Sequence, residues 1–223
     1  METKQTGWER WDETTRDDCF AYCENYRRFL SGCKTERLFV RAAVEVAQER
    51  GFRDLASFPR LAPGDRFFRV NRNKSVIFGV AGSEPFSRGG RFIIAHIDAP
   101  RIDIKAHAVY EDEGIAFFKT VYYGGIRKYQ WLARPHALYG TVCLADGTVK
   151  EIAMGDGPDD PVFTITDLLP HLAKDHEKKT VEEGFPGENL NIIAATIPAT
   201  GTGTKRVEAH IITILKERFS IGP

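Results

Sequence analysis

Residues 91–100 read RFIIAHIDAP, and this stretch decides how the rest of the chain is interpreted. Phe92 to Ala95 are all apolar rather than alternating, a pattern that predicts a strand covered on both faces in the centre of an α/β sheet. The run ends at His96-Ile97-Asp98, followed by Pro100. Residues two apart on a strand point to the same face, so we expect the side chains of His96 and Asp98 to lie together.

Two interpretations of the His96-x-Asp98 pair are open at this point. A metal-binding imidazole commonly has its second nitrogen held by a carboxylate, and the carboxyl ends of α/β strands are where such folds place their ligand crevice. A polar pair that merely ends a strand fits the same residues. One imidazole cannot by itself hold a catalytic zinc ion, which takes about three protein ligands.

The other five histidines give no metal-binding spacing such as HExxH. They lie on the polar face of a predicted strand, in a loop, or on or beside predicted helices: His107, His136, His171, His176 and His210. We interpret each as a surface or packing residue. The paired carboxylates Glu182-Glu183 fall in a polar loop, so the residues alone do not complete a metal site.

The composition of the chain indicates which classes of protein it can belong to. The chain has 223 residues, 42% of them hydrophobic, and 31 basic against 31 acidic side chains, so it can build a core and carries no net charge. Neutral charge disfavours nucleic acid or an anionic membrane as a partner. No signal-peptide pattern or apolar run of membrane-spanning length occurs, which predicts a cytoplasmic protein.

The four cysteines, Cys19, Cys23, Cys33 and Cys143, form no paired CxxC set. A cytoplasmic chain predicts free thiols. Cys19 and Cys23 share one face of a predicted helix, where packing is favoured over a metal role.

The first part of the chain predicts two helices followed by strands. Apolar spacing indicates a helix over residues 13–30 and a second that begins after the cap Thr35 and ends at Gly51. Its expected buried stripe is Leu38, Phe39, Ala42, Ala43, Val46 and Ala47. Short β runs follow over residues 66–70, 75–81 and 91–97, the first two joined by the turn NRNK.

The pattern changes after Pro100. Ile102, Ile104, Ala106 and Ala108 alternate with polar residues, which predicts a half-exposed sheet rather than a buried one. We therefore expect an α/β part over residues 1–100 and a β-rich part over residues 101–223. In the second part, Asp146-Gly147 predicts a hairpin, and NLNIIAATI, residues 189–197, predicts a strand. Helices are expected near residues 166–174, capped by Thr166, and 205–219, capped by Thr204.

Other chemistry finds little support in the motifs. TGTGTKR, residues 200–206, lacks the spacing of a phosphate-binding loop, and no GxSxG nucleophile motif occurs. Aromatic and basic residues alternate over part of the chain: Tyr122, Tyr123, Arg127, Lys128, Tyr129, Trp131 and Arg134. This block fits either an RNA-stacking surface or a protein interface.

Four blocks taken together resemble a known family. AHIDAPRIDIK (95–105), YYGGIRKYQWLARPHALYGTV (122–142), ITDLLPHLAKD (165–175) and ENLNIIAA (188–195) are similar in order and spacing to the aspartyl aminopeptidase and aminopeptidase I family of cocatalytic zinc metallopeptidases. The likeness runs from about Phe67 to the C-terminal helix.

The resemblance implies that His96 is a ligand to one of two zinc ions and that Asp98 is the catalytic carboxylate supporting the metal site beside it. It implies the N-terminal part of a zinc-exopeptidase α/β domain, interrupted by a β-rich dimerisation domain that assembles subunits into large tetrahedral dodecamers. It also implies peptide substrates, and it favours protein contact over RNA for the aromatic block.

Two departures from the family modify this expectation. Family members are about twice as long, and their remaining metal ligands lie in the second half, so this chain is expected to supply part of an active site beside a missing C-terminal half. Where aspartyl-specific members carry a substrate-pocket histidine within residues 165–172, this chain has Asp167 with His171 nearby. We therefore do not expect specificity for acidic N-terminal residues but a broader or neutral-residue specificity, and we assign no substrate-binding residue.

The sequence thus predicts a zinc-dependent aminopeptidase that removes N-terminal residues from peptides, with the β-rich domain truncated. The alternative is a non-catalytic oligomerisation module from a truncated or split aminopeptidase.

Overall fold

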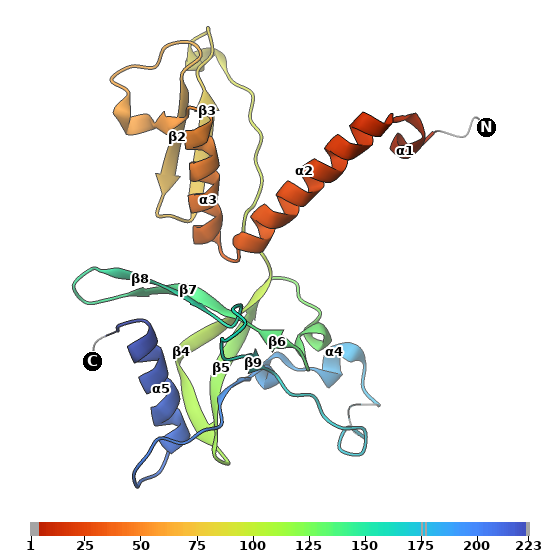
Figure 1. The fold of residues 1–223 in the computed structure, drawn as a ribbon, viewed down its shortest axis with the longest axis vertical. Helices are drawn as coiled ribbons and strands as arrows, with labels where there is room; N and C mark the ends of the chain where they lie inside the picture. The colour runs from red at the N-terminus through yellow and green to blue at the C-terminus, as the bar shows by residue number, and fades with distance from the viewer. Residues whose placement is uncertain (1–4, 175, 177, 222–223) are drawn as a thin grey trace. The chain divides into compact units, whose positions relative to one another are not determined.

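A computed structural model describes residues 5–174, 176 and 178–221. The chain forms two compact units, Met1–Ala99 and Pro100–Pro223, called unit 1 and unit 2 below (Figure 1). The division falls at the proline where the strand pattern of the sequence changes. The fold class is mixed, with helices and sheets in both units.

Unit 1 begins with the short helix α1 (Gly7–Arg10) and the long helices α2 (Glu13–Gly32) and α3 (Glu36–Glu49). The two long helices confirm the prediction. The Asp12 carboxylate accepts from the Thr15 amide at 2.8 Å, and the Thr35 hydroxyl accepts from the Leu38 amide at 3.3 Å, so each helix has a side-chain cap. Gly51, at φ 81°, follows α3 in the left-handed conformation that favours glycine.

A small sheet with the order β1-β2-β3 completes the regular structure of unit 1. Strand β1 (Arg53–Asp54) pairs parallel with β2 (Arg66–Asn71), and β2 pairs antiparallel with β3 (Ser75–Val80). The predicted turn between β2 and β3 is confirmed, with Arg72 and Asn73 at φ 50° and 55°. Short 3₁₀ turns η1 (Leu55–Ser57) and η2 (Phe86–Arg88) lie on the connections.

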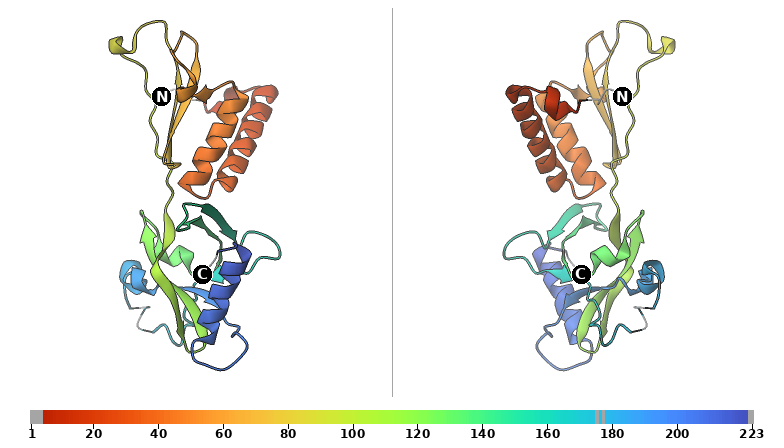
Figure 2. Two further views of the ribbon diagram at one scale, coloured as in Figure 1. Left: turned by 90° about the vertical axis from the view of Figure 1, so that its left-hand side faces the viewer. Right: turned by 90° about the vertical axis from the view of Figure 1, so that its right-hand side faces the viewer.

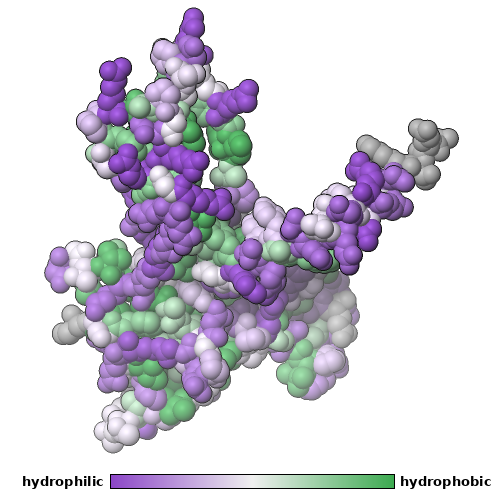
Figure 3. All heavy atoms as spheres, turned by 45° about the horizontal axis from the view of Figure 1, so that its top comes forward, coloured by the Kyte–Doolittle hydropathy of each residue, from purple (hydrophilic) through white to green (hydrophobic). Residues whose placement is uncertain are grey.

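Helix α3 packs on one face of this sheet (Figures 1 and 2). The buried apolar residues of the unit are Val40, Ala47 and Phe68, a smaller set than the predicted stripe, and Val46 is exposed. Helix α2 buries no residue at all. Apolar side chains of unit 1 consequently reach the surface among polar ones (Figure 3).

The prediction of a central strand at residues 92–95 is wrong for this structure. Residues 89–100 have no regular secondary structure, and the side chains of Ile93 and Ile94 are 101% and 90% exposed. A strand needs hydrogen-bonded neighbours, and one that is apolar on both faces also needs a layer on each side. Among the described residues, no strand pairs with this segment.

Unit 2 is built on a five-stranded antiparallel sheet with the order β4-β5-β10-β9-β6. Its strands are β4 (Arg101–Asp112), β5 (Ile115–Tyr123), β6 (Pro135–His136), β9 (Phe163–Thr164) and β10 (Ile192–Ala195). A hairpin of β7 (Leu138–Cys143) and β8 (Val149–Met154) forms a separate two-stranded sheet. Helix α5 (Arg206–Arg218) packs against β4, β5 and β10 (Figures 1 and 2).

One hydrophobic core holds unit 2 together. Its buried members come from the strands, the loops between them and α5: Ala108, Ala116, Phe118, Met154, Phe163, Ile165, Leu190, Ile192, Val207 and Ile211. Thr120, the buried polar residue of this core, donates its hydroxyl to the Leu190 carbonyl at 2.5 Å. A buried hydroxyl with a partner avoids the free-energy cost of an unsatisfied polar group.

Two strand predictions in unit 2 have definite outcomes. The hairpin at Asp146-Gly147 is confirmed, with Gly147 at φ 86° and the Asp146 carboxylate accepting from the Thr148 amide at 2.8 Å. The regular alternation after Pro100 is broken, because the register of β4 shifts between Ile104 and Val109 and His107 has φ 53°. This irregularity buries Ala108 while Ala106 is exposed, although both were expected on one face.

The helix predicted at residues 166–174 is absent, and turns occupy residues 170–172. Pro170 falls inside the expected helix, where it lacks an amide donor and disfavours helical backbone at Leu169. The remaining short elements of unit 2 are η3 (Lys128–Trp131), α4 (Val181–Gly184) and η4 (Gly187–Asn189). Within the part of the chain that is described, no helix is long and apolar enough to span a bilayer.

Helix α5 is present where predicted, but its N-cap is Lys205 in the left-handed conformation, and Thr204 makes no cap. The Glu111 carboxylate on β4 accepts instead from the amides of Val207 and Glu208, at 2.8 and 2.9 Å. A carboxylate at this end also interacts favourably with the positive end of the helix dipole.

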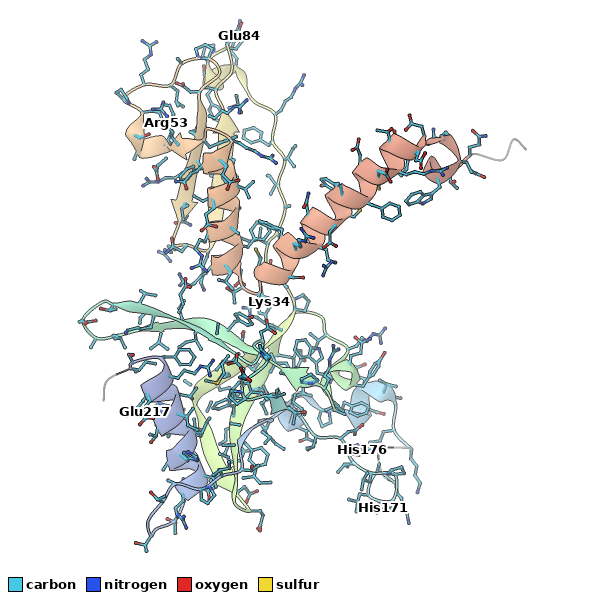
Figure 4. The ribbon with its side chains drawn as sticks, viewed as in Figure 1. Lys34, Arg53, Glu84, His171, His176 and Glu217 are labelled. Carbon is cyan, nitrogen blue, oxygen red and sulfur yellow. The ribbon has the colours of Figure 1, made fainter. Side chains whose placement is uncertain are left out.

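Replacing Glu111 with alanine should lower the free energy of unfolding by about 1–2 kcal/mol, because two amides lose a charged acceptor. Urea denaturation followed by circular dichroism measures the change. Glu217→Ala, in the last turn of α5 (Figure 4), is the matched control and should change stability by less than about 0.5 kcal/mol. Equal effects of the two substitutions would contradict the capping role.

Asp160 ties the loop after β8 to the end of α5. Its carboxylate accepts from the amides of Gly155 and Gly157, at 2.9 and 3.1 Å, and forms an ion pair with the Arg218 guanidinium. These amide bonds, and then Arg218, lower the pKa of Asp160 to about 2. A pKa below the unfolded value of about 3.9 means that the carboxylate stabilises the fold above that value and loses this contribution as the pH falls towards 2.

Asp160→Asn should therefore destabilise the protein at pH 7, and the difference from the unmodified protein should shrink as the pH is lowered from about 4 towards 2. Melting temperatures of both proteins over this range measure it. A difference that stays constant with pH would show that the charge of Asp160 contributes nothing.

Candidate functional site

His96 and Asp98 lie in the extended segment at the end of unit 1, and the structure brings their side chains together. The Nδ1 atom of His96 lies 3.2 Å from the Asp98 carboxylate Oδ1 and 3.0 Å from the Asp98 carbonyl oxygen. Both oxygens can only accept, so Nδ1 is the nitrogen that carries the proton. The side chain of His96 is 84% exposed, and its Nε2 is left as the nitrogen able to bind a metal ion.

The arrangement of this pair fits one ligand of a zinc ion. Imidazole nitrogen is a preferred zinc ligand, and a carboxylate on the opposite ring nitrogen fixes the tautomer and the orientation of the ring. Within the described residues, no group of three or more His, Cys, Asp or Glu side chains could hold a metal ion. The residues described therefore fit one ligand with its supporting carboxylate.

Three other histidines make structural contacts inside unit 2. His136 is stacked on Trp131, with ring centroids 5.6 Å apart, and its Nε2 bonds to the Trp131 carbonyl at 2.8 Å. Burial lowers the pKa of His136, although the bond to Trp131 acts in the opposite direction. The lowered pKa favours the neutral ring at pH 7. His210 Nδ1 bonds to the Ile197 carbonyl at 2.7 Å, and His176 packs edge-on against Phe185.

His171 and His176 lie on the connection between β9 and α4 (Figure 4). This connection also carries Asp167 and the exposed apolar side chains of Leu168, Leu169 and Leu172. Here the sequence predicted a helix, and the structure has a loop that presents three leucines to solvent.

The aromatic and basic block makes contacts within unit 2. The Arg101 guanidinium lies 4.1 Å from the ring centre of Tyr123, and the Lys128 ammonium lies 5.9 Å from that of Tyr122. Gly187 lies under the Tyr122 ring, where an added Cβ would come within 2.7 Å of a ring carbon. Part of the block therefore packs its own unit, which neither the RNA nor the interface interpretation had predicted.

Comparison with known proteins identifies the class. The family described as "Aminopeptidase I zinc metalloprotease (M18)" matches residues 29–223. The chain belongs to this family.

Curated relatives with the name "Probable M18 family aminopeptidase 1" include a Thermotoga maritima protein, 42% identical over 212 residues, which are 95% of this chain and 46% of the relative. The Borrelia garinii relative is 39% identical over 219 residues, which are 98% of this chain and 48% of the relative. This chain therefore spans about half the length of the curated relatives that it matches.

Solved structures give the same result. The M18 aminopeptidase of Thermotoga maritima matches with a TM-score of 0.91 at 39% identity, covering 99% of this chain and 48% of that one. Aminopeptidase I of Borrelia burgdorferi matches with a TM-score of 0.84 at 34% identity, covering 97% of this chain and 49% of that one. The chain has the fold of half of an M18 aminopeptidase.

Proposed function

We propose that this chain supplies part of the active site of a zinc-dependent aminopeptidase that removes neutral N-terminal residues from peptides. The observation that carries the proposal is the contact between His96 Nδ1 and Asp98, in a chain that belongs to a zinc metallopeptidase family. Zinc bound there would supply Lewis acidity and a bound water of lowered pKa, and a complete site would hold two such ions.

The two residues have separate roles in this proposal. His96 offers Nε2 as a metal ligand, and Asp98 holds the Nδ1 proton and so keeps Nε2 in its coordinating form. We assign no peptide-binding residue within these 223 residues.

The exposed apolar segment supports a division of the active site between two regions of a longer enzyme or two polypeptides. Ile93 and Ile94, directly before His96, are exposed although their pattern is that of a buried strand. Strands and helices from the complementary half would cover them and would bring the remaining ligands to His96. We propose unit 2 as the inserted domain through which subunits associate.

Co-expression with the C-terminal half of the Thermotoga maritima relative, the part beyond the matched region, should restore zinc-dependent release of N-terminal residues from short peptides. This chain alone should show no turnover and no stoichiometric zinc, because it carries one imidazole ligand and its supporting carboxylate. Metal analysis and a peptidase assay of the purified complex measure both. Turnover by the chain alone, with stoichiometric zinc, would overturn the division of the site.

In the reconstituted complex, His96→Ala should lower bound zinc by about one ion per site, because it removes the proposed ligand of one of the two ions, and should lower kcat/KM by at least about 100-fold. Asp98→Ala should weaken zinc binding by about 10–100-fold, because the imidazole loses the carboxylate that orients it. His107→Asn is the matched control: the residue lies on β4 at positive φ, which asparagine tolerates, and zinc content should not change. Loss of zinc in the control, or full zinc in His96→Ala, would refute the assignment.

The second candidate is a non-catalytic association module, favoured by one observation. Unit 2 has its own core, whereas unit 1 buries only a few apolar residues among those described. Both functions predict that the chain associates in sedimentation, so the complementation assay separates them. Self-association, together with failure of every complementing half to restore activity, would favour the module.

A further inference from the structure

Two cysteines lie one turn apart on the exposed helix α2 of unit 1. Cys19 and Cys23 are four positions apart, a spacing that places helical side chains on one face with Cβ atoms about 5–6 Å apart. Both are free thiols, as are Cys33 and Cys143.

The pair is accessible to small solutes. Helix α2 buries no residue, Cys23 is exposed and Cys19 is half-buried. Tyr22 and Tyr26 lie beside the two thiols on the helix and stack on each other, with ring centroids 6.5 Å apart and planes 19° apart. The thiols therefore adjoin an exposed aromatic surface.

The number of donor atoms limits which ion or group this pair of thiols can bind. Zinc in structural sites takes four ligands, and within the described residues no third His, Cys, Asp or Glu joins these thiols to form a metal-binding group. Soft thiolate sulfur selects soft ions. Trivalent arsenic that carries one organic group needs two further bonds, which is the number that this pair offers.

We propose that Cys19 and Cys23 form a bidentate site for trivalent organic arsenic, with an aryl substituent of the arsenical packed against Tyr22 and Tyr26. This site is separate from His96 and Asp98, and it does not depend on the proposed peptidase function.

The reaction is a condensation without change of oxidation state. An arsenoxide R–As=O and two thiols give R–As(S–Cys)₂ and one water, so two As–S bonds replace the arsenic–oxygen bond and the two thiol protons leave in the water. Desolvation, and then the neighbouring Cys23, raise the pKa of Cys19, so this thiol carries its proton at neutral pH. After the first As–S bond forms, the second thiol reacts intramolecularly, which favours the pair over single thiols.

Titration of the reduced full chain with phenylarsine oxide tests this site. One equivalent should remove two of the four thiols, as counted by reaction with a thiol reagent, and intact mass should show one phenylarsenic group per chain. A dithiol such as dimercaptopropanol should reverse the binding, whereas a tenfold higher concentration of a monothiol should not.

Cys19→Ser and Cys23→Ser should each abolish the phenylarsine oxide binding that a monothiol does not reverse. The Cys33→Ser/Cys143→Ser double variant is the matched control and should bind one equivalent unchanged. Circular dichroism of each variant checks that helix α2 is intact, and Cys→Ala variants replace any that do not fold. Retention of monothiol-resistant binding in Cys19→Ser, or its loss in the control, would overturn the proposal.

Discussion

The pairing of β10 with β5 is the interaction on which unit 2 depends. It joins Ile192 to Phe118 and brings Leu190 to the buried Thr120 hydroxyl, a contact between residues 70 positions apart. On the other side of β10, β9 pairs through Thr164, so β10 links both halves of the sheet. Ordering so long a connection costs entropy, which the burial of Phe118, Leu190 and Ile192 offsets.

The same requirement for strand partners explains the contrast with unit 1. Its sheet ends at β3, and the apolar segment before His96 is not paired with any strand of the described residues. The sequence of this segment has the apolar pattern of a buried strand. We attribute its exposure to the lack of neighbouring strands and not to a low intrinsic preference of these residues for β structure. An exposed apolar segment that can pair as an edge strand is a template for another chain, which supports the proposal that a complementary half covers it.

The sequence predicted those features that depend on interactions between residues close together in the chain. The cap of α3 at Thr35, the left-handed Gly51 and the hairpin at Asp146-Gly147 depend on residues within a few positions, and all are present. The helix at residues 166–174 was predicted with Thr166 as its cap, and Pro170 disfavours it. The cap of α5 comes from Glu111, 96 positions before Val207, and no local pattern points to such a partner.

The candidate site also depends partly on residues that are close together in the chain and partly on residues that are far apart. The contact between His96 and Asp98 joins residues two apart, so it forms without a surrounding sheet, and the sequence could predict it. A carboxylate preset on Nδ1 reduces the freedom that the ring would lose on binding a metal ion. The other ligands of the proposed metal site would have to approach from positions far along the chain or from a second one, so their placement depends on a fold that this pair alone cannot specify. In the proposed function, the pair would determine which nitrogen faces the metal, and the remaining ligands would determine whether the metal is held.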